Sequence, residues 1–247
     1  MKMTPFATKA LAMLIAGCGF FAVAQNSPKA VTPEPRSKEK WWVDRHQKKL
    51  EAPEREKAKI VYIGDSIVHG FENAGKATWA KYYAPRNSLN LGFSGDRTEN
   101  VLWRLDNGEV DNIKPKLVIM MIGTNNTGHR RDKPADIAAG IKAILDKLHQ
   151  KLPETKVLLL SIFPRGAKGD DPLRVNNEEA NALIEKFADN KNIFYLNINK
   201  TFLADDGTLP REIMPDLLHP NAKGYELWAE AIEPTVAKLL GETPISK

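Results

Sequence analysis

Five short apolar runs, separated by stretches of mixed polarity, constrain the fold of this chain more than any other feature. They cover residues 60–63, 89–91, 117–122, 157–163 and 193–198. A continuous apolar run of this length is typical of a strand that is covered on both faces, and such strands form parallel sheets. The runs therefore predict a five-stranded parallel sheet.

Helical patterns fill the gaps between the runs. From Ile137 to Leu148 apolar residues recur at helical spacing, and Pro134 stands at a suitable first position. Further helices are predicted at residues 97–105, 175–188 and 222–240. Pro234 is expected to end or kink the last of them. Strands that alternate with helices predict a single α/β domain of three layers with right-handed crossovers.

The first 24 residues have the pattern of a secretory signal peptide. Lys2 and Lys9 supply a positively charged start. Residues 10–24 are apolar but too short to span a bilayer comfortably, and a small-x-small cleavage motif ends at Ala24. We therefore expect an exported protein, periplasmic or secreted, with no stable membrane span and with a mature chain that begins at Gln25.

Cys18 is the only cysteine, and it offers a second interpretation of this segment. Residues 15–18 resemble a bacterial lipobox, which would leave a lipid on Cys18; an uncleaved membrane anchor is a third alternative. The cut after Ala24 is favoured because residues 19–24 are still apolar, whereas lipoproteins usually become polar there. After that cut the mature chain has no cysteine, which excludes disulfides, thiolate metal sites and a cysteine nucleophile.

Residues 25–40 are rich in Pro, Lys, Ser and Glu, and this composition predicts a linker ahead of a domain at 41–247. Trp41 and Trp42 mark the start of that domain. Removing Lys2 and Lys9 with the signal leaves 34 basic residues against 31 acidic ones, a net charge of +3. Because the excess is small and no basic stripe carries interleaved aromatics, nucleic acid is not an expected partner.

Small and polar residues cluster where the predicted strands end. The clusters are Gly64-Asp65-Ser66 and residues 90–96, 123–126 and 163–166. Ligands of open α/β sheets bind outside the carboxyl ends of the strands. Ser66 is therefore a candidate nucleophile, although serine is also a common helix N-cap and this simpler role fits the same turn.

A nucleophilic serine needs a base to take its proton and a group that orients the base. Among the five histidines, His219 fits best, because Asp216 precedes it by three residues. Pro220 follows and disfavours helical geometry at His219, so both side chains are expected on a loop from which they can reach one site.

The remaining histidines fit less well. His46 and His149 lie in charged helical stretches and are expected to be solvated. His69 is expected at the surface or at the rim of the site. His129 lies in a polar loop and has no obvious orienting acid.

Acyl transfer also needs N–H donors that face the developing oxyanion. The candidates are the backbone N–H groups of Ser66 and Gly95 and the side-chain amide of Asn125. Asn125 also begins a glycosylation sequon. We discount that role because the signal looks bacterial and the residue is expected at the edge of the sheet.

Taken together, Gly64-Asp65-Ser66, Gly95, Asn125 and Asp216-x-x-His219 resemble the four blocks of the SGNH (GDSL-type) hydrolase superfamily. Within it the chain is most similar to the catalytic subunits of the intracellular platelet-activating-factor acetylhydrolases and their bacterial relatives. The stretches "VLWRLDNGEVDNIKPKLVI", "FPRGAKGDDPLR" and "ADDGTL" carry the likeness beyond the blocks, over roughly residues 41–240.

The resemblance implies a flavodoxin-like fold with a five-stranded parallel sheet. It implies Ser66 as nucleophile, His219 as general base and Asp216 as its orienting acid, with Ser66, Gly95 and Asn125 as the oxyanion hole. No metal or organic cofactor is implied, and a homodimer is among the oligomeric states that the resemblance leaves open.

Two features depart from that group. Its intracellular members carry no signal peptide, which puts a lipid-mediator substrate in doubt, and residues 129–134 have no confident match. The sequence predicts a secreted serine esterase for short acyl esters, above all acetyl esters of carbohydrates. The alternatives are a phospholipid or lysophospholipid esterase and, in another class, a non-catalytic glycan-binding module on the same scaffold.

Overall fold

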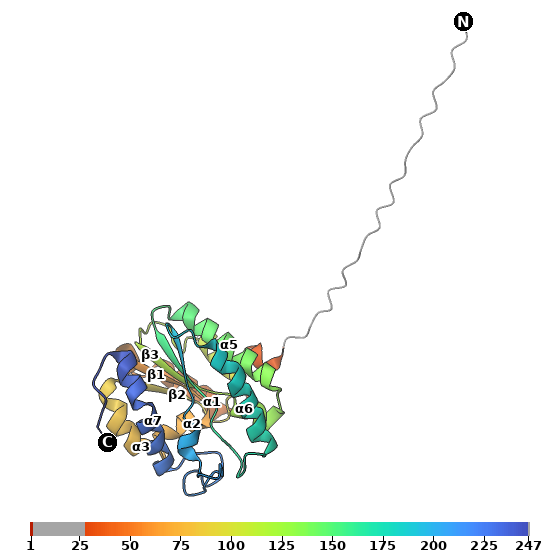
Figure 1. Ribbon diagram of the computed structural model, residues 1–247. Coiled ribbons are helices and arrows are strands. Elements are labelled where there is room, and N and C mark those ends of the chain that lie inside the picture. Colours follow the sequence, from red (N-terminus) through yellow and green to blue (C-terminus); the bar gives the residue numbers. More distant parts are fainter. Residues whose placement is uncertain (2–27, 247) are drawn as a thin grey trace.

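The protein is described by a computed structural model, which covers Met1 and residues 28–246 (Figure 1). The predicted signal peptide, its cleavage site and Cys18 lie outside the described residues. The strands are β1 (Ile60–Gly64), β2 (Ser88–Gly92), β3 (Leu117–Met121), β4 (Lys156–Leu160) and β5 (Ile193–Leu196). All neighbouring strands are parallel, in the order β2-β1-β3-β4-β5, so the five-stranded parallel sheet is confirmed.

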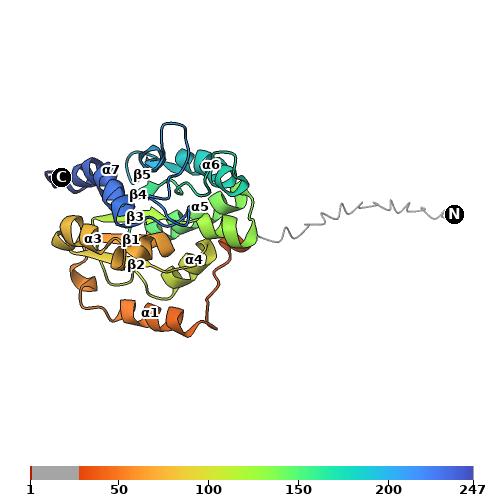
Figure 2. The same ribbon diagram turned by 90° about the horizontal axis from the view of Figure 1, so that it is seen from below.

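Helices cover both faces of the sheet, as Figure 2 shows. The α-helices are α1 (Lys40–Leu50), α2 (Ser66–His69), α3 (Lys76–Tyr82), α4 (Thr98–Asp106), α5 (Pro134–Lys151), α6 (Pro172–Ile184) and α7 (Ala222–Leu240). Shorter helical turns are η1 (Lys29–Val31), η2 (Arg55–Lys57), η3 (Gly70–Glu72), η4 (Ala84–Arg86), η5 (Asn126–Arg130), η6 (Glu185–Phe187) and η7 (Asn199–Phe202), of which η5 is a π-type turn.

The two faces of the sheet have separate apolar cores, because successive strand residues point to opposite sides. Val61 and Ile63 of β1 pack with α4, α5 and α6. Ile60 and Tyr62, their neighbours in the same strand, pack on the side of α2, α3 and α7, where Trp228 is fully buried. This arrangement is the expected three-layer fold.

Helix α7 confirms the prediction for residues 222–240 but does not end at Pro234. Buried residues on both sides of the proline, Ile232 and Val236 among them, hold the two halves against the sheet. Glu233, next to the proline, pairs with Arg86 at 2.7 Å in a buried ion pair. Packing thus outweighs the hydrogen bond that the proline cannot donate.

The linker prediction is wrong for residues 28–40, which lie against the domain. Ala30 is buried, and its carbonyl accepts a hydrogen bond of 2.8 Å from the Thr98 hydroxyl. The carbonyl of Glu34 accepts from the Asn100 amide at 2.9 Å, and Arg36 donates to the carbonyl of Ser94. The segment is ordered by polar partners on α4 and on the loop after β2, and composition alone does not reveal such partners.

His46 also differs from its prediction, because it is 7% exposed rather than solvated. Its ring lies 6.0 Å from that of Trp42 and 5.3 Å from that of Trp103, and its Nε2 lies 3.1 Å from the carbonyl of Asn107. The buried side of α1 therefore covers the edge of the domain at β2. Figure 2 shows this helix beside β2 and α4.

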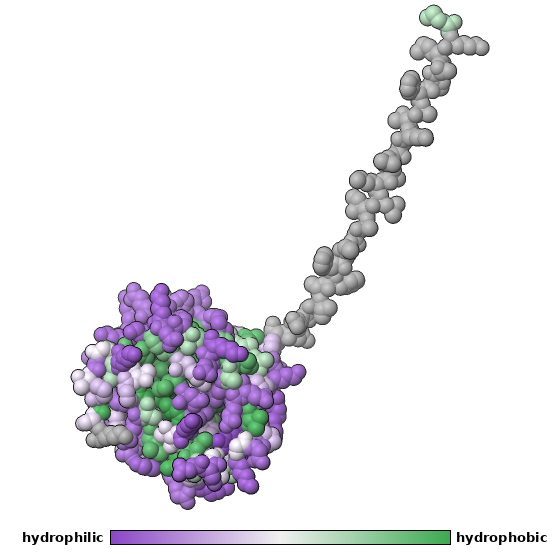
Figure 3. Space-filling model, in the orientation of Figure 1, coloured by the Kyte–Doolittle hydropathy of each residue, from purple (hydrophilic) through white to green (hydrophobic). Residues whose placement is uncertain are grey.

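On the face shown in Figure 3, hydrophilic residues surround several areas of exposed hydrophobic residues. Within residues 28–246, no helix combines the length and the apolarity that crossing a bilayer requires.

Candidate active site

Ser66 lies at the sharp turn between β1 and α2. Asp65 caps the helix, since its Oδ1 accepts a hydrogen bond of 3.0 Å from the backbone N–H of Ile67. Gly64 is required before it, because a Cβ there would lie 2.4 Å from both the Met121 carbonyl and a Val68 methyl group. The turn places Ser66 at the carboxyl edge of the sheet, where it is the first residue of α2.

The structure brings Ser66, His219 and Asp216 together. The Oγ of Ser66 is 2.8 Å from Nε2 of His219, and Nδ1 of His219 is 2.6 Å from Oδ2 of Asp216. Because the carboxylate accepts a hydrogen bond from Nδ1–H, the neutral ring presents an unprotonated Nε2 to the serine hydroxyl. This is the arrangement in which a histidine can take the proton of a serine.

Asp216 is held by its own loop as well as by the imidazole. Its Oδ1 accepts hydrogen bonds from the backbone N–H groups of Leu218 and His219, at 3.0 and 2.7 Å. Partial burial raises the pKa of Asp216, but the hydrogen bonds from the side chain and backbone of His219 outweigh it and lower that pKa overall. The acid therefore stays ionised at neutral pH and keeps the imidazole in one orientation.

The loops after β2 and β3 flank the Ser66 turn, because these strands pair with β1 on its two sides. Gly95 in the first loop has a φ of +80°, a conformation that favours glycine. The side-chain amide of Asn125 in the second loop donates a hydrogen bond of 3.0 Å to the carbonyl of Asp96. This hydrogen bond joins the two loops that carry the predicted donors, and the second N–H of the amide has no hydrogen-bond partner in the described structure.

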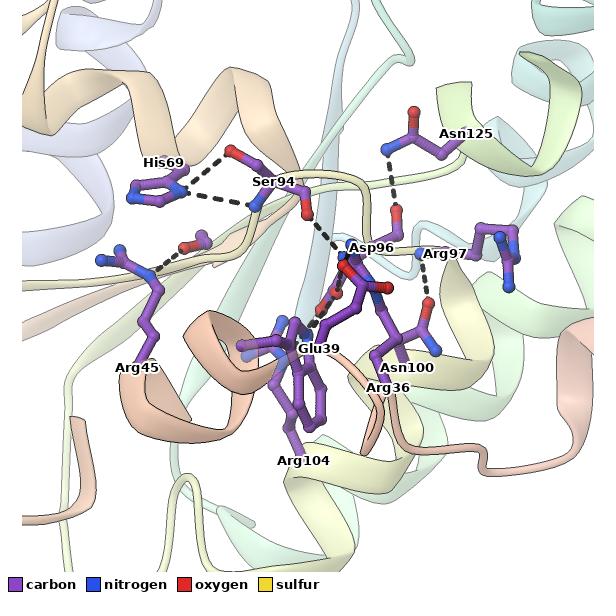
Figure 4. A network of polar contacts seen from close by, with 12 residues as sticks. Arg36, Glu39, Arg45, His69, Ser94, Asp96, Arg97, Asn100, Arg104 and Asn125 are labelled. Atoms are coloured by element: carbon purple, nitrogen blue, oxygen red, sulfur yellow. Dashed lines mark hydrogen bonds and ion pairs between the residues drawn. The ribbon is translucent and has the colours of Figure 1, made fainter. Parts of the chain in front are cut away.

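A buried carboxylate, which the sequence analysis did not single out, fixes the loop after β2 (Figure 4). Asp96 accepts hydrogen bonds from the indole of Trp42 at 2.7 Å, from Arg36 at 3.0 Å and from Arg104 at 2.9 Å. Burial raises the pKa of Asp96, and its cationic and indole partners act against that rise. The only local signal was an aspartate directly after Gly95, and nothing in the sequence pattern pointed to its partners.

His69 contacts the same loop from the other side, at the rim position predicted for it. Its Nδ1 lies 2.9 Å from the Ser94 hydroxyl, and Trp41 stacks beside it with ring centroids 6.5 Å apart. Burial and the nearby charge of Arg45 lower the pKa of His69 to about 4. The imidazole is neutral at pH 7 and positions Ser94 rather than carrying charge.

His129 lies in η5, in the loop after β3. Burial and the charges of Arg97, Arg36 and Arg165 lower its pKa. Among the residues that the structure describes, no group of three or more His, Cys, Asp or Glu side chains is arranged to hold a metal ion.

A serine joined to a histidine–aspartate pair at the carboxyl edge of a parallel sheet defines an α/β serine hydrolase. Residues 62–227 match the family model described as the GDSL-like Lipase/Acylhydrolase family. The chain belongs to this family and is a serine ester hydrolase, so the predicted superfamily is confirmed.

Similar proteins support this assignment. The alpha1 subunit of platelet-activating factor acetylhydrolase IB from Homo sapiens is 33% identical over 202 residues, covering 81% of this chain and 85% of that protein. The alpha2 subunit from Rattus norvegicus is 33% identical over 210 residues, covering 83% and 88%. These relatives are similar over nearly the whole folded domain.

Solved structures share the fold. A GDSL-like lipase from Bacteroides thetaiotaomicron has a TM-score of 0.66 and 21% identity, covering 79% of this chain and 97% of that chain. The acetylxylan esterase Axe2 from Geobacillus stearothermophilus has a TM-score of 0.58 and 17% identity, covering 77% and 97%.

Proposed function

We propose that this protein is an exported esterase that hydrolyses short-chain esters, above all acetyl esters of carbohydrates, with Ser66 as its nucleophile. The 2.8 Å contact between Ser66 Oγ and His219 Nε2, backed by Asp216, is the observation that carries this proposal. An assembled triad argues against a non-catalytic binding module, whose mark would be a missing catalytic group.

The reaction begins when Ser66 Oγ attacks the ester carbonyl while His219 Nε2 takes the hydroxyl proton. Negative charge forms on the former carbonyl oxygen. The N–H groups of Ser66, Gly95 and Asn125 stabilise it, because they are already fixed in place before the reaction. Asp216 stabilises the imidazolium that forms.

His219 then gives its proton to the leaving alcohol, and an acyl group remains on Ser66. Water enters, loses a proton to His219 and attacks the acyl carbon, and the second oxyanion occupies the same donors. Collapse of this intermediate returns the proton to Ser66 and releases the acid. These steps need no redox chemistry, and they return the enzyme to its starting state.

Bulky residues beside the triad support a small acyl group. Ile67 directly follows the nucleophile and is buried, and half-buried Leu218 directly precedes the base. Side chains of this size on both sides limit the room for a long acyl chain. The 33%-identical relatives are named as acetylhydrolases, and an acetyl group is likewise a small acyl group.

A surface near the loop after β2 supports a carbohydrate, because His69, which contacts Ser94 of that loop, lines it. A hollow of about 740 Å³ extends from His69 along α1, with Trp41, Arg45 and Lys48 among its lining residues. Trp41 is 41% exposed. The guanidinium of Arg36 lies over this ring, 5.2 Å from its centroid. The exposed part of the indole suits the apolar face of a sugar ring, and the polar groups around it are hydrogen-bonding partners for the hydroxyls.

A phospholipid ester is the second candidate, and the similarity to platelet-activating factor acetylhydrolase subunits favours it. The two candidates are separated by measuring acetate release from acetylated xylan, acetylated sialic acids and a platelet-activating-factor-like lipid. Release from the glycans supports the proposal, and release from the lipid alone contradicts it.

Ser66→Ala tests the nucleophile. We expect the variant to keep the thermal unfolding midpoint of the wild type and to lose hydrolysis of p-nitrophenyl acetate. Turnover that persists in a folded Ser66→Ala protein removes Ser66 from this role.

Export is part of the proposal and has its own test. The mass of the mature N-terminus, measured after expression in a bacterium, distinguishes a chain that begins at Gln25 from one that begins at a lipidated Cys18. An intact Met1 in the mature protein contradicts both alternatives.

A further inference from the structure

Arg165 and Arg131 are two cations beside the site that form no ion pair within residues 28–246. Their neighbours differ in this respect: Arg36 pairs with Asp96, and Arg130 pairs with Asp132. Arg165 is half-buried. Partial burial removes water from a guanidinium, and this costs free energy when no carboxylate of the protein pairs with it. An anionic ligand would offset that cost.

Arg165 lies between the two loops that carry the oxyanion amide and the base. Its Nη1 donates to the carbonyl and the hydroxyl of Thr124, at 2.8 and 3.1 Å, one residue before Asn125. The next residue, Gly166, donates its N–H to the carbonyl of Leu217 at 3.0 Å, in the loop of His219. The guanidinium is thus held at the mouth of the site, while only Nη1 has a hydrogen-bond partner in the described structure.

The carboxylates near Arg165 are already committed to other groups. Asp216 bonds to His219 and to its own backbone, and Asp65 caps α2. Burial lowers the pKa of Arg165, and the charges of Asp171, Asp65 and Asp216 act against this from a distance. None of the three comes within 4.0 Å of it, so the charge of Arg165 remains available to a ligand.

Arg131 adds a second charge to the same place. It is exposed at the end of η5, in the left-handed conformation with φ of +58°. The turn that ends at Arg131 packs against Arg165, because a Cβ on Gly128 of η5 would lie 2.7 Å from Nη1 of Arg165. The charge of Arg131 also lowers the pKa of Arg165. The charge of Arg165 also lowers the pKa of His129, which lies in the same turn as Gly128.

We propose that Arg165 and Arg131 form a binding subsite for an anionic group, a carboxylate or a phosphate, on the alcohol part of the ester. Arg offers planar pairs of N–H donors that match both anions. The alcohol leaves with a proton from His219, and Arg165 is joined to the loop of that histidine, so the subsite lies on the leaving-group side. This inference rests on the proposed esterase function and narrows its substrate class to acidic sugar esters or phosphate-bearing esters.

The test compares two esters that differ in charge and little else: 4-acetoxyphenylacetate, a carboxylate, and 4-acetoxyphenylacetamide, its neutral counterpart. We expect the wild type to favour the carboxylate, with a ratio of kcat/KM values of at least roughly tenfold, the size of one charge-assisted hydrogen bond. 4-Acetoxybenzyl phosphate forms a second arm, and the stronger of the two preferences indicates which anion the natural substrate carries.

The variants Arg165→Gln and Arg131→Asn are expected to bring the ratio towards one, mainly by raising KM for the charged ester. Arg131→Asn is informative even where the loss of Arg165 disturbs the Thr124 loop, because asparagine tolerates the left-handed conformation. Lys186→Gln, which removes an exposed charge from η6 at the opposite edge of the sheet, is the matched control and should keep the wild-type ratio.

The outcomes separate this inference from the esterase proposal. Equal wild-type rates on both esters, or an equal loss of preference in Lys186→Gln, overturn the subsite and leave the esterase intact. A wild-type protein that hydrolyses neither ester overturns the proposed function and the subsite with it.

Discussion

The loop after β2 and the loop before α7 carry opposite halves of the site, and they are held in opposite ways. The Asp96 side chain is fully buried and bonded by residues of the N-terminal segment, α1 and α4. Asp216 and His219 have side chains that are 55% and 40% exposed, and apart from Ser66 their bonds run within their own loop. Donors that must stay fixed depend on distant parts of the chain, whereas a base that exchanges protons is held locally.

Asp216→Asn should give the largest effect of these variants. We expect it to lower activity through the exposed loop alone, without disturbing the buried loop. The amide can keep an acceptor towards the backbone but favours the wrong tautomer of His219, so we expect kcat to fall by about 10³–10⁴-fold. The free energy of unfolding should change by less than about 1 kcal/mol, because the residue is exposed. Steady-state kinetics and urea unfolding of the same preparation test both halves of this statement.

Asp96→Ala should disrupt the buried loop, and we expect its main effect to be on the stability of the fold. It leaves the guanidiniums of Arg36 and Arg104 without their shared carboxylate, at an expected cost of about 3–5 kcal/mol in the free energy of unfolding. Asp44→Ala, which removes an exposed pair with Lys40, is the control and should cost less than about 1 kcal/mol. Similar unfolding midpoints for the two variants in urea would show that the Asp96 network does not stabilise the fold.

Asn125→Ala separates catalysis from stability at the buried loop, because it removes a proposed oxyanion donor while leaving the Asp96 carboxylate in place. We expect kcat to fall by roughly a hundredfold or more, with little change in KM, since the amide acts on the transition state. An unchanged kcat would mean that the amide serves only to hold the carbonyl of Asp96.

Asp65→Asn, at the turn between the two loops, should give an effect on stability that depends on pH. Burial raises the pKa of Asp65 from 3.8 to about 7, although the N–H of Ile67 and the charge of His219 act against this. Between these values the folded protein keeps a proton that the unfolded chain has lost, so the stability contributed by this group falls as pH rises.

Asparagine can still accept from Ile67 and carries no charge, so its advantage over the wild type should grow from near zero at pH 4 to about 4 kcal/mol at pH 8. Urea unfolding at both pH values measures it. A difference that does not change with pH would show that Asp65 titrates normally.

The sheet and most helices could be predicted because both depend on local periodicity. Ser66, Asp216 and His219 could be proposed for a related reason: strand ends meet at one edge, and an acid three residues before a histidine can bond to it. The Asp96 network could not be found in this way. Arg36 and Asp96 are 60 positions apart, and no spacing rule joins a cation in a polar segment to a carboxylate buried in a loop.

His46 teaches the same lesson from the apolar side. A charged stretch predicted a solvated histidine, yet Trp42 and Trp103 cover the ring because α1 packs across the β2 edge. Burial there depends on which element lies opposite, and that is a property of the assembled fold.

The packing of residues 28–40 would also limit the reach of the catalytic domain in a form that is anchored through Cys18. If Cys18 carries a lipid, only residues 19–27 separate the anchor from the first residues that lie on the domain. Nine residues reach at most about 30 Å when fully extended. Such a short tether would confine the catalytic domain to the layer next to the lipid headgroups, whereas a cut after Ala24 would release it with almost no free tail.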